Sequence, residues 1–106
     1  MGRQHEAIVP LKKAVDLDAA NAEAHFRLSE ALYGIGDYRE ARTASERALR
    51  NNKDLARAQS LLGDSHFKLG ELQEAKIWYL KAKESSRFKD YATAQLEEIE
   101  RLKKSP

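Results

Sequence analysis

A period of 34 residues runs through the chain and limits which folds it can adopt. Shifting the sequence by this period superposes one set of glycines, one of glutamates and two of alanines. The sets are Gly2, Gly36 and Gly70; Glu6, Glu40 and Glu74; Ala7, Ala41 and Ala75; and Ala14, Ala48 and Ala82. Only five glycines occur in the 106 residues, and three of them keep the register. Such a period is typical of stacked copies of one small structural unit.

The repeated unit is expected to be helical. Alanine supplies 16 residues and leucine 13, whereas valine, isoleucine and threonine together supply only 8. Alanine and leucine favour helices, and β-branched residues are enriched in strands. The length suits one domain, so the composition predicts a single all-α domain.

Apolar spacing and capping residues predict about six helices. Asn21 and Asp37 are suited to cap helix starts, and Gly36 and Gly70 permit the left-handed turn that follows a helix end. Pro10 lies inside the first helix and is expected to kink or strain it. The expected helices cover residues 4–16, 22–35, 37–50, 55–69, 71–84 and 90–103.

Two longer stretches and one partial stretch carry a recognisable pattern of small and large residues. They are AEAHFRLSEALYGIGDYREARTASERAL (Ala22 to Leu49), ARAQSLLGDSHFKLGELQEAKIWYLKAK (Ala56 to Lys83) and GRQHEAIVPLKKAVDLD (Gly2 to Asp18). In period, glycine punctuation and alanine positions the chain resembles the tetratricopeptide repeat (TPR) family.

The chain departs from the family pattern at several positions. His25 and Gln59 stand where the family has Trp, and Lys53 and Arg87 replace the proline between repeats. Ser45 stands where a large aromatic residue is usual. We therefore expect the first complete repeat to pack loosely around Ser45.

The resemblance implies a right-handed helical-repeat solenoid of antiparallel helix pairs. One domain would cover residues 1–106, with the second half of a repeat at 2–20, full repeats at 21–54 and 55–88, and a C-terminal capping helix at 89–104. In that last helix, Ala92, Leu96 and Ile99 would face inward, and Thr93, Glu97 and Glu100 would form a polar outer stripe.

The first helix lacks the partner helix of a complete repeat. The chain is therefore expected to be the C-terminal fragment of a longer TPR array, with Ala7, Leu11 and Ala14 facing water. Ile8 and Val15 would still turn partly toward the next repeat.

In the TPR family the first helix of each pair lines a concave groove that holds a peptide or a helix. The resemblance places there Glu23, Phe26, Glu30, Tyr33, Arg57, Ser60, Asp64, Phe67, Tyr91 and Glu98. Three of them, the acids Glu30, Asp64 and Glu98, recur 34 residues apart. Tyr33 and Phe67 would form an aromatic ledge beside this row. A row of acids predicts a partner that is apolar and carries Lys or Arg. Alternatively, these are solvated positions with no ligand.

The groove does not match the clamp by which co-chaperones of this family hold the acidic tails of heat-shock chaperones. That clamp uses Lys, Asn and Arg, whereas the matching positions hold Phe26, Glu30, Leu61, Tyr91 and Gln95. Glu30 would repel a carboxylate, so a chaperone-tail clamp is not expected.

No motif indicates an active site, a cofactor or a metal, and the chain is expected not to be an enzyme. The chain has no Cys, and His25 and His66 fall at inward packing positions without a partner ligand nearby in sequence. The formal net charge of +2, with both signs interspersed, argues against nucleic acid as a partner. No apolar run is long enough for a membrane span, and no signal peptide opens the chain, so a cytoplasmic location is expected.

Two hypotheses for function follow. The first is a protein–protein interaction scaffold that binds a peptide or helix in the groove. The second is a structural assembly element that stacks on further repeats or forms a homodimer through its open N-terminal end. The identity of the partner does not follow from the sequence.

Overall fold

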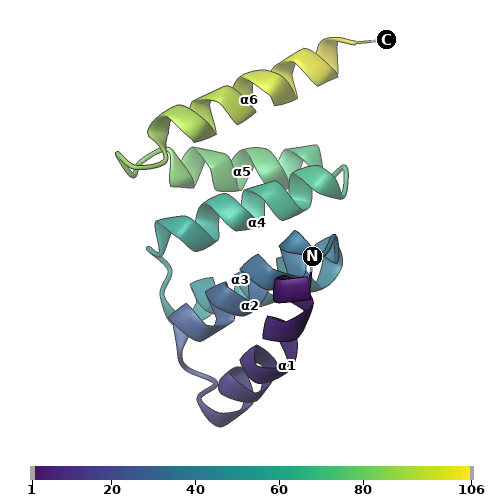
Figure 1. Cartoon of the computed structure of the whole chain (residues 1–106). Coiled ribbons are helices and arrows are strands. Elements are labelled where there is room, and N and C mark those ends of the chain that lie inside the picture. Colours follow the sequence, from purple (N-terminus) through teal and green to yellow (C-terminus); the bar gives the residue numbers. More distant parts are fainter. Residues whose placement is uncertain (1, 106) are drawn as a thin grey trace.

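The computed structural model describes residues 2–105, with side chains for residues 5–105. Six α-helices follow one another in this part of the chain, without a strand. They are α1 (Gly2–Leu17), α2 (Ala22–Gly34), α3 (Tyr38–Asn51), α4 (Ala56–Lys68), α5 (Leu72–Ala82) and α6 (Lys89–Lys104). Figure 1 shows them stacked from α1 to α6, in a body of 44 × 27 × 19 Å. The expected all-α repeat architecture is confirmed.

The predicted capping residues start and end the helices of the first complete repeat. The Asn21 side chain accepts a hydrogen bond from the backbone N–H of Ala24 at 3.0 Å, and Asp37 accepts one from Glu40 at 3.3 Å. Gly36 and Gly70 adopt φ of 86° and 77°, values that residues with a Cβ rarely adopt. These glycines reverse the chain between the helices of each pair, so the helices run antiparallel.

A close helix crossing lies at the centre of each complete repeat. In the first, the Ser29 hydroxyl bonds to the Ala41 carbonyl oxygen at 2.8 Å and to the Ser45 hydroxyl. In the second, a Cβ on Gly63 would lie 2.8 Å from Cε1 of Tyr79. The expectation of loose packing around Ser45 is therefore wrong: Ser45 is fully buried, because the paired hydroxyls occupy the crossing.

The first helix is covered more fully than expected. Leu11 and Ala14, together with Ile8, pack against a core cluster that contains Val15. The expectation that Leu11 and Ala14 face water is thus wrong, because α1 turns this face onto α2 and α3. Ala7 is half-buried. The helix continues past Pro10.

The connection between α5 and α6 departs from the repeat. The fifth helix was expected to reach residue 84 but ends at Ala82. Residues 83–88 form consecutive turns, and Phe88 packs against the core cluster formed by α5 and α6. The longer connection brings Arg87 and Phe88 to the edge of the concave face, where they line a hollow described below.

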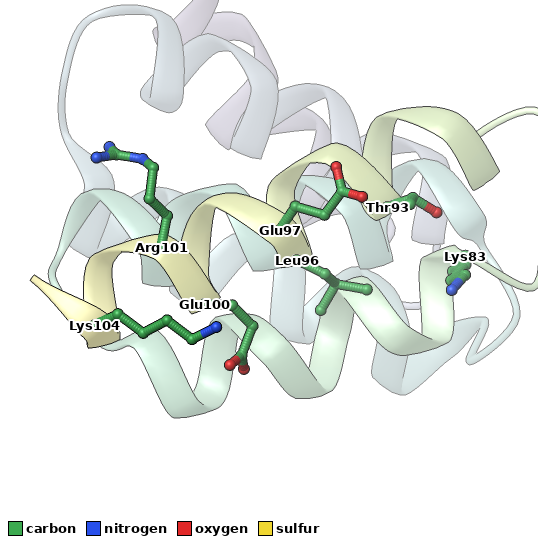
Figure 2. A pocket seen from close by; sticks show the side chains of 7 residues that line it. All are labelled: Lys83, Thr93, Leu96, Glu97, Glu100, Arg101 and Lys104. Atoms are coloured by element: carbon green, nitrogen blue, oxygen red, sulfur yellow. The ribbon is translucent and has the colours of Figure 1, made fainter.

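The last helix has the two faces that the sequence predicts. Ala92 and Ile99 are fully buried, and Leu96 is half-buried against α5. The opposite stripe, with Thr93, Glu97 and Glu100, lines an open hollow (Figure 2). A charged stripe of this kind can face water without a covering helix.

None of the described helices is both long and apolar enough to cross a membrane. The cytoplasmic location stays a prediction.

The carboxylate of Glu71 ties the two complete repeats together. His66 Nδ1 donates a hydrogen bond to Glu71 Oε1 at 2.7 Å, and Arg42 Nη1 on α3 donates to Oε2 of the same carboxylate at 2.9 Å. Glu71 holds the repeat position equivalent to that of Asp37, which caps α3. The side chain of Glu71, however, does not cap α5. The hydrogen bond from His66, and then the one from Arg42, hold the pKa of Glu71 below its usual 4.5.

We predict that Glu71→Gln lowers the free energy of unfolding at pH 7 by about 1 kcal/mol, because a charge-assisted hydrogen bond at a partly exposed site is weakened. Since the pKa of Glu71 is depressed by folding, its contribution is present above the unfolded pKa and is lost as pH falls through the folded pKa. Urea unfolding from pH 7 to pH 3 should therefore show the two proteins converging in acid. A constant difference across that range would contradict this role for the carboxylate.

Candidate functional site

A hollow of about 250 Å³ opens on the concave face between α2, α4 and the α5–α6 connection. Its lining residues are Phe26, Glu30, Arg57, Ser60, Leu61, Asp64, Arg87 and Phe88. Five of the ten residues that the sequence places in the groove meet here: Phe26, Glu30, Arg57, Ser60 and Asp64. Aromatic and aliphatic walls with carboxylates beside them suit an apolar side chain next to a cationic one.

Arg57 is neutralised within the groove. Its guanidinium pairs with Glu23 on the preceding repeat and lies 4.8 Å from the centroid of the Phe26 ring. Glu23 also pairs with Arg27 on its own helix at 3.4 Å. One edge and one face of the Arg57 guanidinium are therefore engaged, so it offers less positive charge to an acidic ligand than an unpaired arginine would.

Asp64 is held by two tyrosines. The hydroxyls of Tyr79 and Tyr91 donate to its Oδ1 at 2.5 and 2.7 Å. Burial raises the pKa of the Asp64 carboxyl, and the two tyrosine hydrogen bonds partly offset that rise. Among the described residues, none donates a hydrogen bond to Oδ2, the second oxygen of the carboxylate. Asp64 thus presents a rigidly placed acceptor beside the hollow.

The three acids that recur at the 34-residue period have different surroundings. Glu98 pairs with Arg101 on its own helix, and the hydrogen bond from Arg101 lowers the pKa of Glu98. Glu30 is exposed and forms no ion pair with any residue that the structure describes. Of the three, Glu30 therefore has the carboxylate most open to a cation.

The predicted aromatic ledge is divided between two core clusters. Tyr33 packs edge-on against Tyr38, with ring centroids 5.1 Å apart, and it borders the first cluster. Burial, and then the charge of Asp64, raises the pKa of Tyr33 to about 12. Phe67 packs into the cluster between α5 and α6. Tyr91 is 44% exposed and reaches the hollow through Asp64.

Sequence reasoning did not place Arg87 or Phe88 in the groove. Arg87 stands where the family has a proline, and its guanidinium lies 5.5 Å from the centroid of the Phe88 ring. The missing proline was the only sequence signal that this connection differs from the family pattern. The early end of α5 is not visible in the repeat pattern. Leu61 also lines the hollow, although the sequence pattern marked it only as a position equivalent to the chaperone-tail clamp.

The two inward histidines have structural partners. His25 Nε2 lies 2.8 Å from the carbonyl oxygen of Ala19, and Gln59, at the same repeat position, donates to the carbonyl oxygen of Lys53 at 2.9 Å. Both side chains hold the turn before their helix. Within residues 5–105 no three His, Asp or Glu side chains are grouped so as to hold a metal ion.

Comparison with solved structures finds several helical-repeat domains of the same architecture. The first TPR domain of Spaghetti (RPAP3), bound to the HSP90 peptide SRMEEVD, is 27% identical with a TM-score of 0.92, over 98% of this chain and 82% of that one. A crystal structure of MamA is 30% identical with a TM-score of 0.90, over 94% of this chain and 58% of MamA.

More distant structures share the fold alone. The Yersinia enterocolitica type III secretion translocator chaperone SycD is 20% identical with a TM-score of 0.91, over 98% of this chain and 77% of that one. No curated protein matches the chain. The sequence profile described as Tetratricopeptide repeat matches residues 26–92, more than half of the chain, and with the six-helix architecture it shows that the chain belongs to the tetratricopeptide repeat family.

Proposed function

We propose that this chain is a non-enzymatic protein–protein interaction scaffold that holds a partner peptide or helix in its concave groove. The observation that carries the proposal is the hollow between Phe26, Leu61 and Phe88, with the carboxylates of Glu30 and Asp64 at its side. The structurally similar first TPR domain of Spaghetti (RPAP3) binds a peptide, which supports peptide binding by this chain.

The partner segment is an apolar one that carries Lys or Arg. Glu30 is exposed and Asp64 keeps one carboxylate oxygen without a described donor, whereas Arg57 is neutralised by Glu23. A cation placed between the two carboxylates gains charge-assisted hydrogen bonds. An apolar neighbour in the segment would cover the Phe88 ring.

An acidic peptide would be a poor partner for this groove. The peptide SRMEEVD bound to Spaghetti (RPAP3) has three acidic side chains near its end and would meet Glu30. Like charges brought together in an interface favour rejection of that partner. Arg87 lines the same hollow and is the group that could offset this repulsion.

We predict that Glu30→Gln weakens binding of a basic peptide roughly three- to tenfold, because one favourable charge interaction of about 1 kcal/mol is lost. The probes are two leucine–alanine decapeptides that differ only in carrying two lysines or two glutamates, with SRMEEVD as a third. Calorimetric titration at low and high salt measures each affinity. The affinity of the variant for the lysine peptide should depend less steeply on salt.

Glu46→Gln is the matched control, because Glu46 is an exposed acid on α3, away from the hollow. It should leave the affinity unchanged. Tighter binding of the glutamate peptide or of SRMEEVD than of the lysine peptide would overturn the basic-partner assignment and leave the scaffold proposal standing. Binding of none of the three would count against the groove itself.

A second candidate function is assembly through α1. Val9 is 71% exposed and Leu17 is 85% exposed, and contact with a second copy through α1 would remove both side chains from water. If α1 mediates a homodimer, the molar mass from light scattering rises with concentration, and Val9→Ser with Leu17→Ser abolishes the rise. A constant monomer mass would exclude this candidate.

A further inference from the structure

The outer side of the first complete repeat contains a second hollow, separate from the concave groove. It measures about 400 Å³ and lies between α1 and α3, with α2 as its floor. Leu28 and Leu32 form part of that floor, and Ala44 and Arg47 belong to the wall on α3. These positions of α2 lie on the face opposite to the one that lines the groove, since residues on one helix face recur every three to four positions.

The second repeat shows what fills this space in the same fold. Between α3 and α5 the Trp78 side chain packs against a cluster that contains Leu49 and Leu62. Lys81 lies over the indole, with Nζ 5.2 Å from the ring centroid. The corresponding outer groove of the second repeat is thus occupied by an aromatic ring under a cation.

The repeat period relates the two outer grooves residue by residue. The equivalent pairs, each 34 apart, are Val15 and Leu49, Leu28 and Leu62, Ala44 and Trp78, and Arg47 and Lys81. The apolar surroundings and the cation are kept in the first repeat, but the indole is replaced by a methyl group. The first hollow therefore keeps the apolar residues and the cation that surround Trp78 in the second repeat, but it contains no aromatic ring.

The outer groove beside α6 has different surroundings. There Lys83 and Leu96 hold the equivalent positions, and Glu97, Glu100, Arg101 and Lys104 also line the hollow (Figure 2). Lys83 replaces the apolar residue that Val15 and Leu49 supply in the other two grooves, whereas the first hollow keeps Val15 together with Leu28 and Leu32. The aromatic environment is therefore repeated only in the first and second grooves.

A buried histidine forms part of the wall of the first hollow. His25 also lines it, and its side chain is 5% exposed. Because the Ala19 carbonyl oxygen can only accept, His25 Nε2 must be the donor in their hydrogen bond. In the neutral ring Nδ1 is then an acceptor, and this atom is buried without a partner among the described residues. Because this nitrogen is almost inaccessible, the occupant of the hollow is inferred from the repeat and not from this atom.

We propose that this hollow binds a tryptophan side chain presented by a segment of another protein. The ring would rest on Leu28 and Leu32 and lie beneath Arg47, as Trp78 lies beneath Lys81. The ion pair between Lys12 and Glu40, 3.8 Å apart, spans the same hollow, and both side chains are more than half exposed. Such a pair opens at little cost, so it does not block entry.

The first test fills the hollow with a side chain of the protein itself. Ala44→Trp should raise the midpoint of thermal unfolding by a few degrees, because the ring occupies existing space. In a Trp78→Phe background the introduced indole should fluoresce at shorter wavelength than one introduced by Glu46→Trp at an exposed position of the same helix. A lower midpoint than wild type, or emission equal to that of the Glu46→Trp control, would overturn the proposal.

The second test uses the unaltered protein and a probe of the proposed chemistry. N-acetyl-tryptophanamide at about 10 mM should shift the amide resonances of Val15, His25 and Arg47, since a single side chain binds with a Kd on the order of millimolar. N-acetyl-leucinamide at the same concentration should not, and Ala44→Trp should abolish the response. Equal shifts with both probes, or none with either, would contradict the proposal.

Light scattering distinguishes the source of the occupant. The proposal expects a molar mass that Ala44→Trp leaves unchanged at every concentration. A wild-type dimer that Ala44→Trp converts to a monomer would assign the hollow to a second copy of this chain and overturn the assignment to another protein. Because the hollow lies on the outer face, this result does not depend on the groove proposal.

Discussion

The close crossing of the two helices in each complete repeat is the contact on which the rest of the structure depends. The first repeat uses two hydroxyls there, Ser29 and Ser45, and the second uses Gly63 against the ring of Tyr79. In both, one helix contributes a small residue so that its partner can approach. Ridges of side chains interlock only at a short interhelical distance, so this pairing sets which faces of the helices turn outward.

Two outward faces follow from that packing and have different chemistry. The concave face brings Asp64 and Glu30 beside an apolar hollow, and the same ring that fills the second crossing, Tyr79, fixes the Asp64 carboxylate. The outer face has a groove in each repeat, filled by Trp78 in one and left open at Ala44 in the other. Tyr79 therefore belongs to the core and also positions a candidate binding residue.

Most of the fold could be predicted because it depends on local and periodic signals. Asn21 and Asp37 act on backbone groups three residues away, which a sequence displays directly. The hydroxyl pair at Ser45 could not be predicted, since it depends on a contact 16 residues apart in sequence. The early end of α5 brings Arg87 and Phe88 into the groove, and there Phe88 packs against residues of α5 and α6 that are distant in sequence from one another. In the site, residue positions were predictable, but the pairing that neutralises Arg57 required the three-dimensional arrangement.

A double-mutant cycle at the crossing tests most directly the claim that complementary residue sizes hold the helix pair together. The measurement is the free energy of unfolding of Ser45→Tyr, Ser29→Gly and the double variant, which recreates the Gly63–Tyr79 pair in the first repeat. Ser45→Tyr alone should cost about 1–3 kcal/mol or more through overpacking. The double variant should be more stable than the sum of the single costs predicts, with a coupling of at least about 1 kcal/mol. Costs that simply add would show that the two positions do not determine each other and would contradict the account.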